Sequence, residues 1–186
     1  MDRFSLHAPL RKGPFRLLDE LGADVGTVKG DLTLRMHGEV TDAKGNVVLA
    51  AQSPEVFGED EFTARITDGN DASLGAVSKA GDAHFVRERW IVRNPVGEPV
   101  AVIEERGRLR ALIASWRLPA GRTYDITRPG LEVGGGAPAP GALVGSARRS
   151  WLATRWHVAV DDDPTADLDR RHVLAAVAVM AIDQGF

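Results

Sequence analysis

The chain has 186 residues, of which 44% are hydrophobic and 26% charged, and its formal net charge is -3. These values are typical of a globular chain with one core, and they exclude disordered, collagen-like and membrane-spanning classes. The chain has no cysteine, which excludes a disulfide scaffold, a thiol nucleophile and thiolate metal sites. Its acidic balance argues against a globally basic nucleic-acid binder. We therefore expect a single domain over residues 1–186.

Location and origin can also be predicted. The segment from Met1 to Ser5 leads into no apolar run of the secretory type. The longest apolar run, Val173 to Ile182, is shorter than the roughly 20 residues of a membrane-spanning helix. We expect a cytoplasmic protein without a transmembrane segment. Arginine provides all but four of the 23 basic residues, a composition that suggests a bacterial source with GC-rich DNA.

Most of the chain is predicted to form short β-strands separated by turns. Turn signals occur at 42–46, 68–71 and 94–97, where Asp or Asn caps the turn and Gly accepts a positive φ. This regular spacing favours an antiparallel sandwich or barrel. Alternating or β-branched segments predict strands at 25–28, 32–40, 47–51, 61–67, 73–78, 85–93, 100–104, 123–127, 131–133, 142–146 and 151–160.

A weak internal repeat accompanies these strands. An aliphatic-Gly-x-Val step occurs at 25–28 and again at 74–77, each followed by a longer strand and a turn. Two similar β units are one interpretation of the repeat. The alternative is that each glycine marks a β-bulge for unrelated reasons.

Two segments carry helical patterns. Between residues 106 and 118, apolar residues at i, i+3, i+4 and i+7 predict a short amphipathic helix. The run from Val173 to Ile182 is apolar on every face, with Asp167 or Asp169 as the N-cap. Such a helix must be buried on all sides, and in a β-rich chain a closed barrel around it satisfies this condition. A further buried strand is the alternative.

The order of these features resembles the Tubby-like superfamily, in particular its LURP-one-related and phospholipid-scramblase-like branches. The resemblance rests on the strand-turn-strand segments 25–47 and 89–100 and on the terminal segment 168–179. It implies a closed antiparallel barrel of about twelve strands around a central C-terminal helix. Tubby proteins bind phosphoinositides through a basic surface, scramblases are associated with membranes and calcium, and many LURP-one-related proteins have no assigned activity.

A basic segment between residues 106 and 128 holds six arginines and one acid, Asp125. Arginine suits phosphate, and a basic amphipathic helix with a tryptophan is typical of an interfacial membrane contact. We therefore take as candidate lipid-headgroup residues Arg106, Arg108, Arg110, Arg117 and Trp116. The alternative is that the apolar stripe packs on the barrel while the arginines face water.

An acidic segment precedes the C-terminal helix. Asp161, Asp163 and Asp167 have the oxygen ligands that calcium prefers. An EF-hand beginning at Asp161 fails, because Ala166 replaces the sixth-position Gly and His172 the twelfth-position Glu. A looser calcium site and simple turn-and-cap chemistry both remain open.

The sequence contains no motif for catalysis or cofactor binding. It lacks HExxH, a Walker lysine, GxSxG and a dinucleotide fingerprint, and its five histidines have no zinc-like spacing. We therefore expect a non-catalytic domain without a cofactor that binds phospholipid headgroups or an anionic membrane surface peripherally. A protein-interaction or scaffold module is the alternative, and a lipocalin-type carrier would need an empty barrel.

Overall fold

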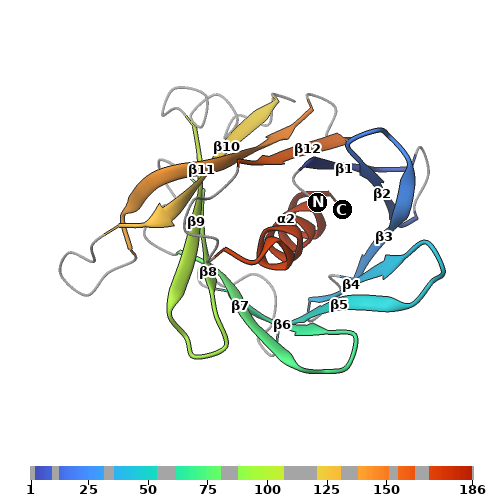
Figure 1. Cartoon of the computed structure of the whole chain (residues 1–186), viewed down its shortest axis with the longest axis horizontal. Coiled ribbons are helices and arrows are strands. Elements are labelled where there is room, and N and C mark those ends of the chain that lie inside the picture. The colour runs from blue at the N-terminus through green and yellow to red at the C-terminus, as the bar shows by residue number, and fades with distance from the viewer. Residues whose placement is uncertain are drawn as a thin grey trace.

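A computed structural model describes residues 3–9, 13–31, 36–53, 62–80, 88–106, 121–130, 138–150, 155–161 and 168–185. Twelve antiparallel strands close into a barrel in which each strand pairs with its neighbours in the chain and β1 pairs with β12 (Figure 1). The predicted fold class is confirmed. The strands are β1 (Arg3–His7), β2 (Phe15–Asp19), β3 (Asp24–Asp31), β4 (His37–Asp42), β5 (Val47–Gln52), β6 (Phe62–Asp68), β7 (Ser73–Lys79), β8 (Arg89–Arg93), β9 (Pro99–Glu105), β10 (Arg122–Pro129), β11 (Pro140–Arg149) and β12 (Arg155–Val160).

The first two strands were not predicted from the sequence. In β1 and β2 the inward positions Phe4, Leu6, Phe15 and Leu17 are buried, but each alternation spans only five residues. Of the predicted strand 32–40, residues 37–40 belong to β4, Met36 does not, and residues 32–35 lie outside the described residues. The predicted strand 131–133 and the predicted helix beyond residue 106 lie outside the described residues.

Four hairpin turns share one geometry. Asp19, Asp42, Asp68 and Asn94 each accept two backbone N–H bonds on Oδ1, from the residues two and four positions later, at 2.8–3.1 Å. The fourth residue of each turn has a positive φ and is Gly22, Gly45, Asp71 or Gly97. The side-chain cap and the positive φ let a tight turn match the strand twist. Three of these turns were predicted, and the turn at Asp19 was not.

The repeated glycine step marks a bulge. The pairing of β3 with β2 shifts register next to Gly26, and that of β7 with β6 shifts next to Gly75. A Cβ on either glycine would lie 1.9 Å from a backbone oxygen, of Thr41 or of Arg93 respectively. Only glycine allows this approach of neighbouring strands. The two steps therefore occupy equivalent places in the barrel wall.

The C-terminal helix α2 (Arg170–Gly185) lies inside the barrel (Figure 1). Val173 and residues 175–182 are at most 4% exposed, which confirms the predicted central helix and excludes the alternative of a strand. Asp169 caps the helix, since its Oδ1 accepts the Arg171 N–H at 2.8 Å. The helix occupies the space that a lipocalin-type carrier would need. Within the described residues, no helix combines the length and apolarity needed to cross a bilayer.

Candidate functional site

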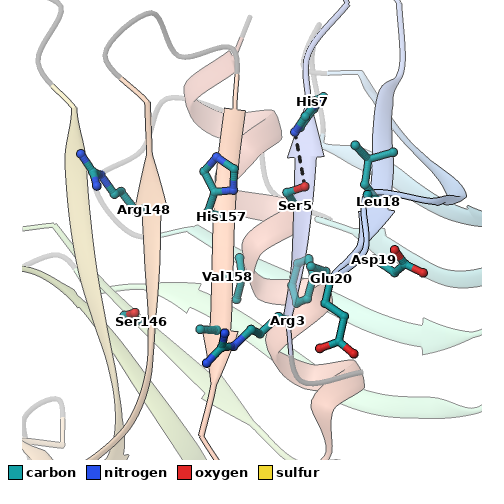
Figure 2. A pocket seen from close by; sticks show the side chains of 13 residues that line it. Arg3, Ser5, His7, Leu18, Asp19, Glu20, Ser146, Arg148, His157 and Val158 are labelled. Carbon is teal, nitrogen blue, oxygen red and sulfur yellow. Dashed lines mark hydrogen bonds between the residues drawn. The ribbon is translucent and has the colours of Figure 1, made fainter.

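An open groove of about 480 Å³ lies on the outer wall of the barrel, over β11, β12, β1 and β2 (Figure 2). It brings together strands from the two ends of the chain, because β1 and β12 close the barrel. Its lining residues are Arg3, Phe4, Ser5, His7, Leu18, Asp19, Glu20, Gly22, Ser146, Arg148, His157, Val158 and Ala159.

Strand register aligns basic side chains across this wall. His7 on β1 lies directly opposite Arg16 on β2 and Arg155 on β12. In the next cross-strand row, His157 lies opposite Arg148 on β11. Directly opposed side chains on one face have Cβ atoms about 4.5–5.5 Å apart. We call the set Arg3, His7, Arg16, Arg148, Arg155 and His157 the basic wall.

The arginines of the basic wall are only partly neutralised. Arg16 pairs with Asp24 at 2.9 Å. In the part of the chain that the structure describes, Arg3, Arg148 and Arg155 form no ion pair. Like charges on neighbouring strands cost stability. A bound anion would remove this cost, so the arrangement suits an anionic ligand.

Two acidic residues also line the groove, at the turn after β2. The Asp19 carboxylate caps that turn by accepting the Leu21 and Ala23 N–H groups at 2.9 and 2.8 Å. Figure 2 shows Asp19 on the β2 side of the groove, away from Arg148 on β11. Glu20 follows it in the turn. Asp19 therefore borders the β2 side of the groove, and the basic residues Arg3, His7, Arg148 and His157 lie on β1, β11 and β12.

The centre of the groove holds a hydroxyl and two imidazoles. Ser5 Oγ lies 3.3 Å from His7 Nε2, and the His7 and His157 rings meet edge to face with centroids 6.2 Å apart (Figure 2). Burial lowers the pKa of His7, and the positive charges of Arg155, His157 and Arg16 lower it further. No carboxylate among the described residues bonds to His7. Among the described residues the Ser5–His7 contact has no orienting carboxylate, and the hydroxyl and imidazoles can offer hydrogen bonds to a ligand in the groove.

The candidate residues from the sequence lie elsewhere. Arg106 follows β9, where Nε contacts both carboxylate oxygens of Asp125 at 2.9 and 3.1 Å, and this hydrogen bonding raises the pKa of Arg106. Its side chain is 56% exposed, so a ligand could reach it. Because the guanidinium group is already paired with Asp125, such a ligand would have to compete with that carboxylate. Outside the described residues lie Arg108, Arg110, Trp116 and Arg117.

The structure does not test the predicted calcium site, because two of its three residues lie outside the described residues. Asp161 directly follows β12, whereas Asp163 and Asp167 lie outside the described residues. Across the described ranges, no group of three or more His, Asp or Glu side chains could hold a metal ion. Asp169 instead serves as the helix cap.

A second polar cluster closes the barrel at the C-terminal end of α2, with Glu88 at its centre. Glu88 lies 3.3 Å from Lys79 Nζ and accepts bonds from Arg122 at 3.0 Å, the Tyr124 hydroxyl at 2.8 Å and Gln184 Nε2 at 2.6 Å. These groups come from β7, the segment before β8, β10 and α2. The cluster therefore ties the last turn of the helix to the barrel wall.

Charge within this closing cluster is compensated internally. Lys79 also bonds Asp183 at 3.1 Å. Burial raises the pKa of Asp183, and Lys79 partly offsets that effect. Arg149 donates to the Gln184 side-chain oxygen at 3.0 Å and to its backbone oxygen at 2.8 Å. Because these groups satisfy one another, the cluster holds the end of the helix against the barrel wall.

The sequence does not show which strands pair, so it could not predict which residues form the basic wall. Histidines and arginines of β1 and β12 are scattered residues at opposite ends of the chain, and only the pairing of these strands makes them neighbours. The alternation of Arg3, Ser5 and His7 with buried Phe4 and Leu6 was a usable signal for one outward face.

The chain is similar to a known protein in structure. The chain matches no protein-family model and no curated protein sequence. An X-ray structure of a protein from Arabidopsis thaliana is similar, with 15% sequence identity and a TM-score of 0.49 over 97% of this chain and 90% of that chain. This similarity assigns no function to the chain.

Proposed function

We propose that the domain binds the surface of an anionic membrane peripherally, through phospholipid phosphates that contact the basic wall. The observation that carries this proposal is the cross-strand alignment of arginine and histidine on β2, β1, β12 and β11. The proposed function is non-catalytic and needs no cofactor. It keeps the class of ligand expected from the sequence and moves the contact from the 106–117 segment to the outer barrel wall.

Phosphate chemistry fits the donors of the wall. A guanidinium group presents a planar fork of N–H donors that matches phosphate oxygens, and the Ser5 hydroxyl and both imidazoles add short-range donors or acceptors. Each basic residue near an anionic leaflet contributes about 1 kcal/mol. Arg3, Arg148 and Arg155 together would contribute about 3 kcal/mol on this scale.

An exposed leucine adds an apolar contact at the groove edge. Leu21 is 88% exposed, and its neighbours Glu20 and Gly22 both line the groove. Val96 holds the same position in the turn after β8 and is 77% exposed. In Figure 1, β8 lies across the helix from β2. Leu21→Ser should weaken membrane binding, whereas Val96→Ser, on the opposite side of the barrel, should not.

Liposome flotation tests the proposal. The vesicles are pure phosphatidylcholine or phosphatidylcholine with phosphatidylglycerol, at low and high salt. Arg3→Gln/Arg148→Gln removes two charges from the wall. Lys29→Gln/Arg65→Gln removes the same charge from exposed positions on β3 and β6. A third variant, Arg108→Glu/Arg110→Glu, tests the segment singled out from the sequence.

We expect the wild type to bind anionic vesicles and not pure phosphatidylcholine vesicles. High salt should weaken this binding, because it screens the interaction between surface charges. Binding should fall about tenfold or more in the wall variant, since two cations are worth about 2 kcal/mol, and should persist in the β3/β6 control. Loss of binding only in the 108/110 variant would refute the wall as the contact. Absence of binding under all conditions would refute the lipid function and favour a protein-interaction module.

A further inference from the structure

His7 occupies an unusual electrostatic position in the basic wall. It lies in register between Arg16 on β2 and Arg155 on β12, and the charged or titratable groups facing it within the described residues are these two arginines and His157. Its own strand supplies the Ser5 hydroxyl at 3.3 Å. No described carboxylate bonds to it. An imidazole placed in this way has cationic neighbours on both sides and no anionic partner.

These surroundings disfavour the imidazolium form while the wall is empty. Burial and the neighbouring positive charges lower the pKa of His7, so the ring is neutral at neutral pH. A phosphate seated over the wall would pair with the flanking arginines and reverse the local field. The imidazolium would then gain a partner, and binding would favour uptake of a proton by the ring.

We infer that anion binding at the basic wall is coupled to protonation of His7, so that the domain binds an anionic membrane more tightly as the pH falls. This inference rests on the proposed function. Linkage requires that a ligand which promotes proton uptake binds better at lower pH, by at most about tenfold per pH unit for one imidazole. The affinity of the basic wall for a membrane would thus depend on pH as well as on the charge of the lipids.

Flotation at two pH values tests the coupling. Vesicles of phosphatidylcholine with phosphatidylglycerol suit the measurement because the phosphodiester keeps its charge throughout the range. Binding is compared at about pH 7.5 and about pH 5.5, which bracket imidazole titration, at constant ionic strength. The variants are His7→Gln and, as the matched control, His37→Gln. His37 lies on β4 and contacts Glu39 at 3.2 Å, outside the groove. Thermal unfolding of each variant at both pH values establishes that it is folded.

The wild type and His37→Gln should bind about three- to tenfold more tightly at the lower pH. His7→Gln should bind normally at the higher pH and lose most of this gain. A His7→Gln variant that keeps the full gain would overturn the coupling, as would a wild type whose binding to anionic vesicles does not depend on pH. Both results leave the proposed function standing, whereas absence of binding at both pH values would remove the proposed function as well.

Discussion

Gly38 on β4 offers a direct test of how α2 is seated in the barrel. A Cβ at this position would lie 2.6 Å from Ile182 Cδ1, while the next nearest atoms are 3.6 and 3.8 Å away. Carbon atoms pack at about 3.5–4.0 Å, so the methyl group of Gly38→Ala would lie too close to Cδ1. Ile182 is 1% exposed and cannot swing into solvent. Cδ1 is the far end of the Ile182 side chain, so the substitution forces that side chain to shift within the packed core.

The expected cost follows from this single clash. Overpacking a core typically costs about 1–3 kcal/mol, and replacing Gly by Ala offsets about 0.4–1 kcal/mol through the unfolded chain. We expect Gly38→Ala to lower the free energy of unfolding by about 1–2 kcal/mol. For a chain of this length the melting temperature should fall by roughly 2–8 °C. Urea unfolding followed by circular dichroism measures the loss.

A second substitution makes the test specific. Ile182→Val removes Cδ1 at a cost of about 0.5–1.5 kcal/mol and frees the space that the new methyl group needs. The double variant Gly38→Ala/Ile182→Val should therefore be more stable than the sum of the single effects by about 1 kcal/mol. At Gly30 a Cβ would meet Cγ1, Cδ1 and Cγ2 of Ile182 at 2.5, 2.6 and 2.8 Å. Ile182→Val should not rescue Gly30→Ala, because valine keeps both Cγ atoms that the new methyl group would meet.

Strict additivity at Gly38 would refute the seating of Ile182 against β4. So would a Gly38→Ala protein as stable as the wild type. Rescue of Gly30→Ala by the same Ile182→Val substitution would show that the helix is rotated from the position described. The three outcomes are read from the same unfolding curves.

Three further substitutions test other parts of the fold. Val177→Asp places a charge at a fully buried helix position and should unfold the domain, because an unpaired buried charge costs several kcal/mol against a total of about 5–15; a folded, equally stable variant by circular dichroism would contradict the central helix. Burial raises the pKa of Glu105, so the folded chain holds that proton more tightly and this group favours folding increasingly as the pH falls through the raised pKa. Glu105→Gln should therefore stabilise the domain at neutral pH and flatten its stability between neutral and mildly acidic pH, and an unchanged profile in urea titrations would contradict this. Asp71 has φ 63° where three equivalent turns have glycine, so Asp71→Gly should stabilise the domain by up to about 1 kcal/mol, and a lower melting temperature would argue against strain there.

Local sequence patterns predicted much of the barrel. The Asp or Asn caps of the turns at Asp42, Asp68 and Asn94 act on N–H groups only two and four residues away, so their signal lies within five residues. The all-round apolar run of α2 likewise implied complete burial without any tertiary information. β1 and β2 were missed because an alternation of five residues gives a weaker signal than a hairpin with a capped turn.

The candidate site could not be predicted from local sequence patterns. The basic segment 106–128 is visible because its arginines are close in sequence, but in the described structure Arg106 is bound by Asp125. The basic wall is invisible in sequence because Arg16, His7 and Arg155 become neighbours only across two strand pairings. The pairing of His7 with Arg16 joins strands that are consecutive in the chain, whereas the pairing of His7 with Arg155 arises only when β12 returns to β1 and closes the barrel.

The sequence by itself determined the strand-and-turn style of the chain, the helix that must be buried, and hence the closed barrel around it. These features depend on periodicity and on hydrogen bonds between near neighbours. Only the tertiary structure decided which outward side chains share a surface and which polar groups meet around Glu88 at the end of α2. The physical reason is register: the side-chain period of a strand is two, so one residue of slip would turn His7 and Arg155 inward.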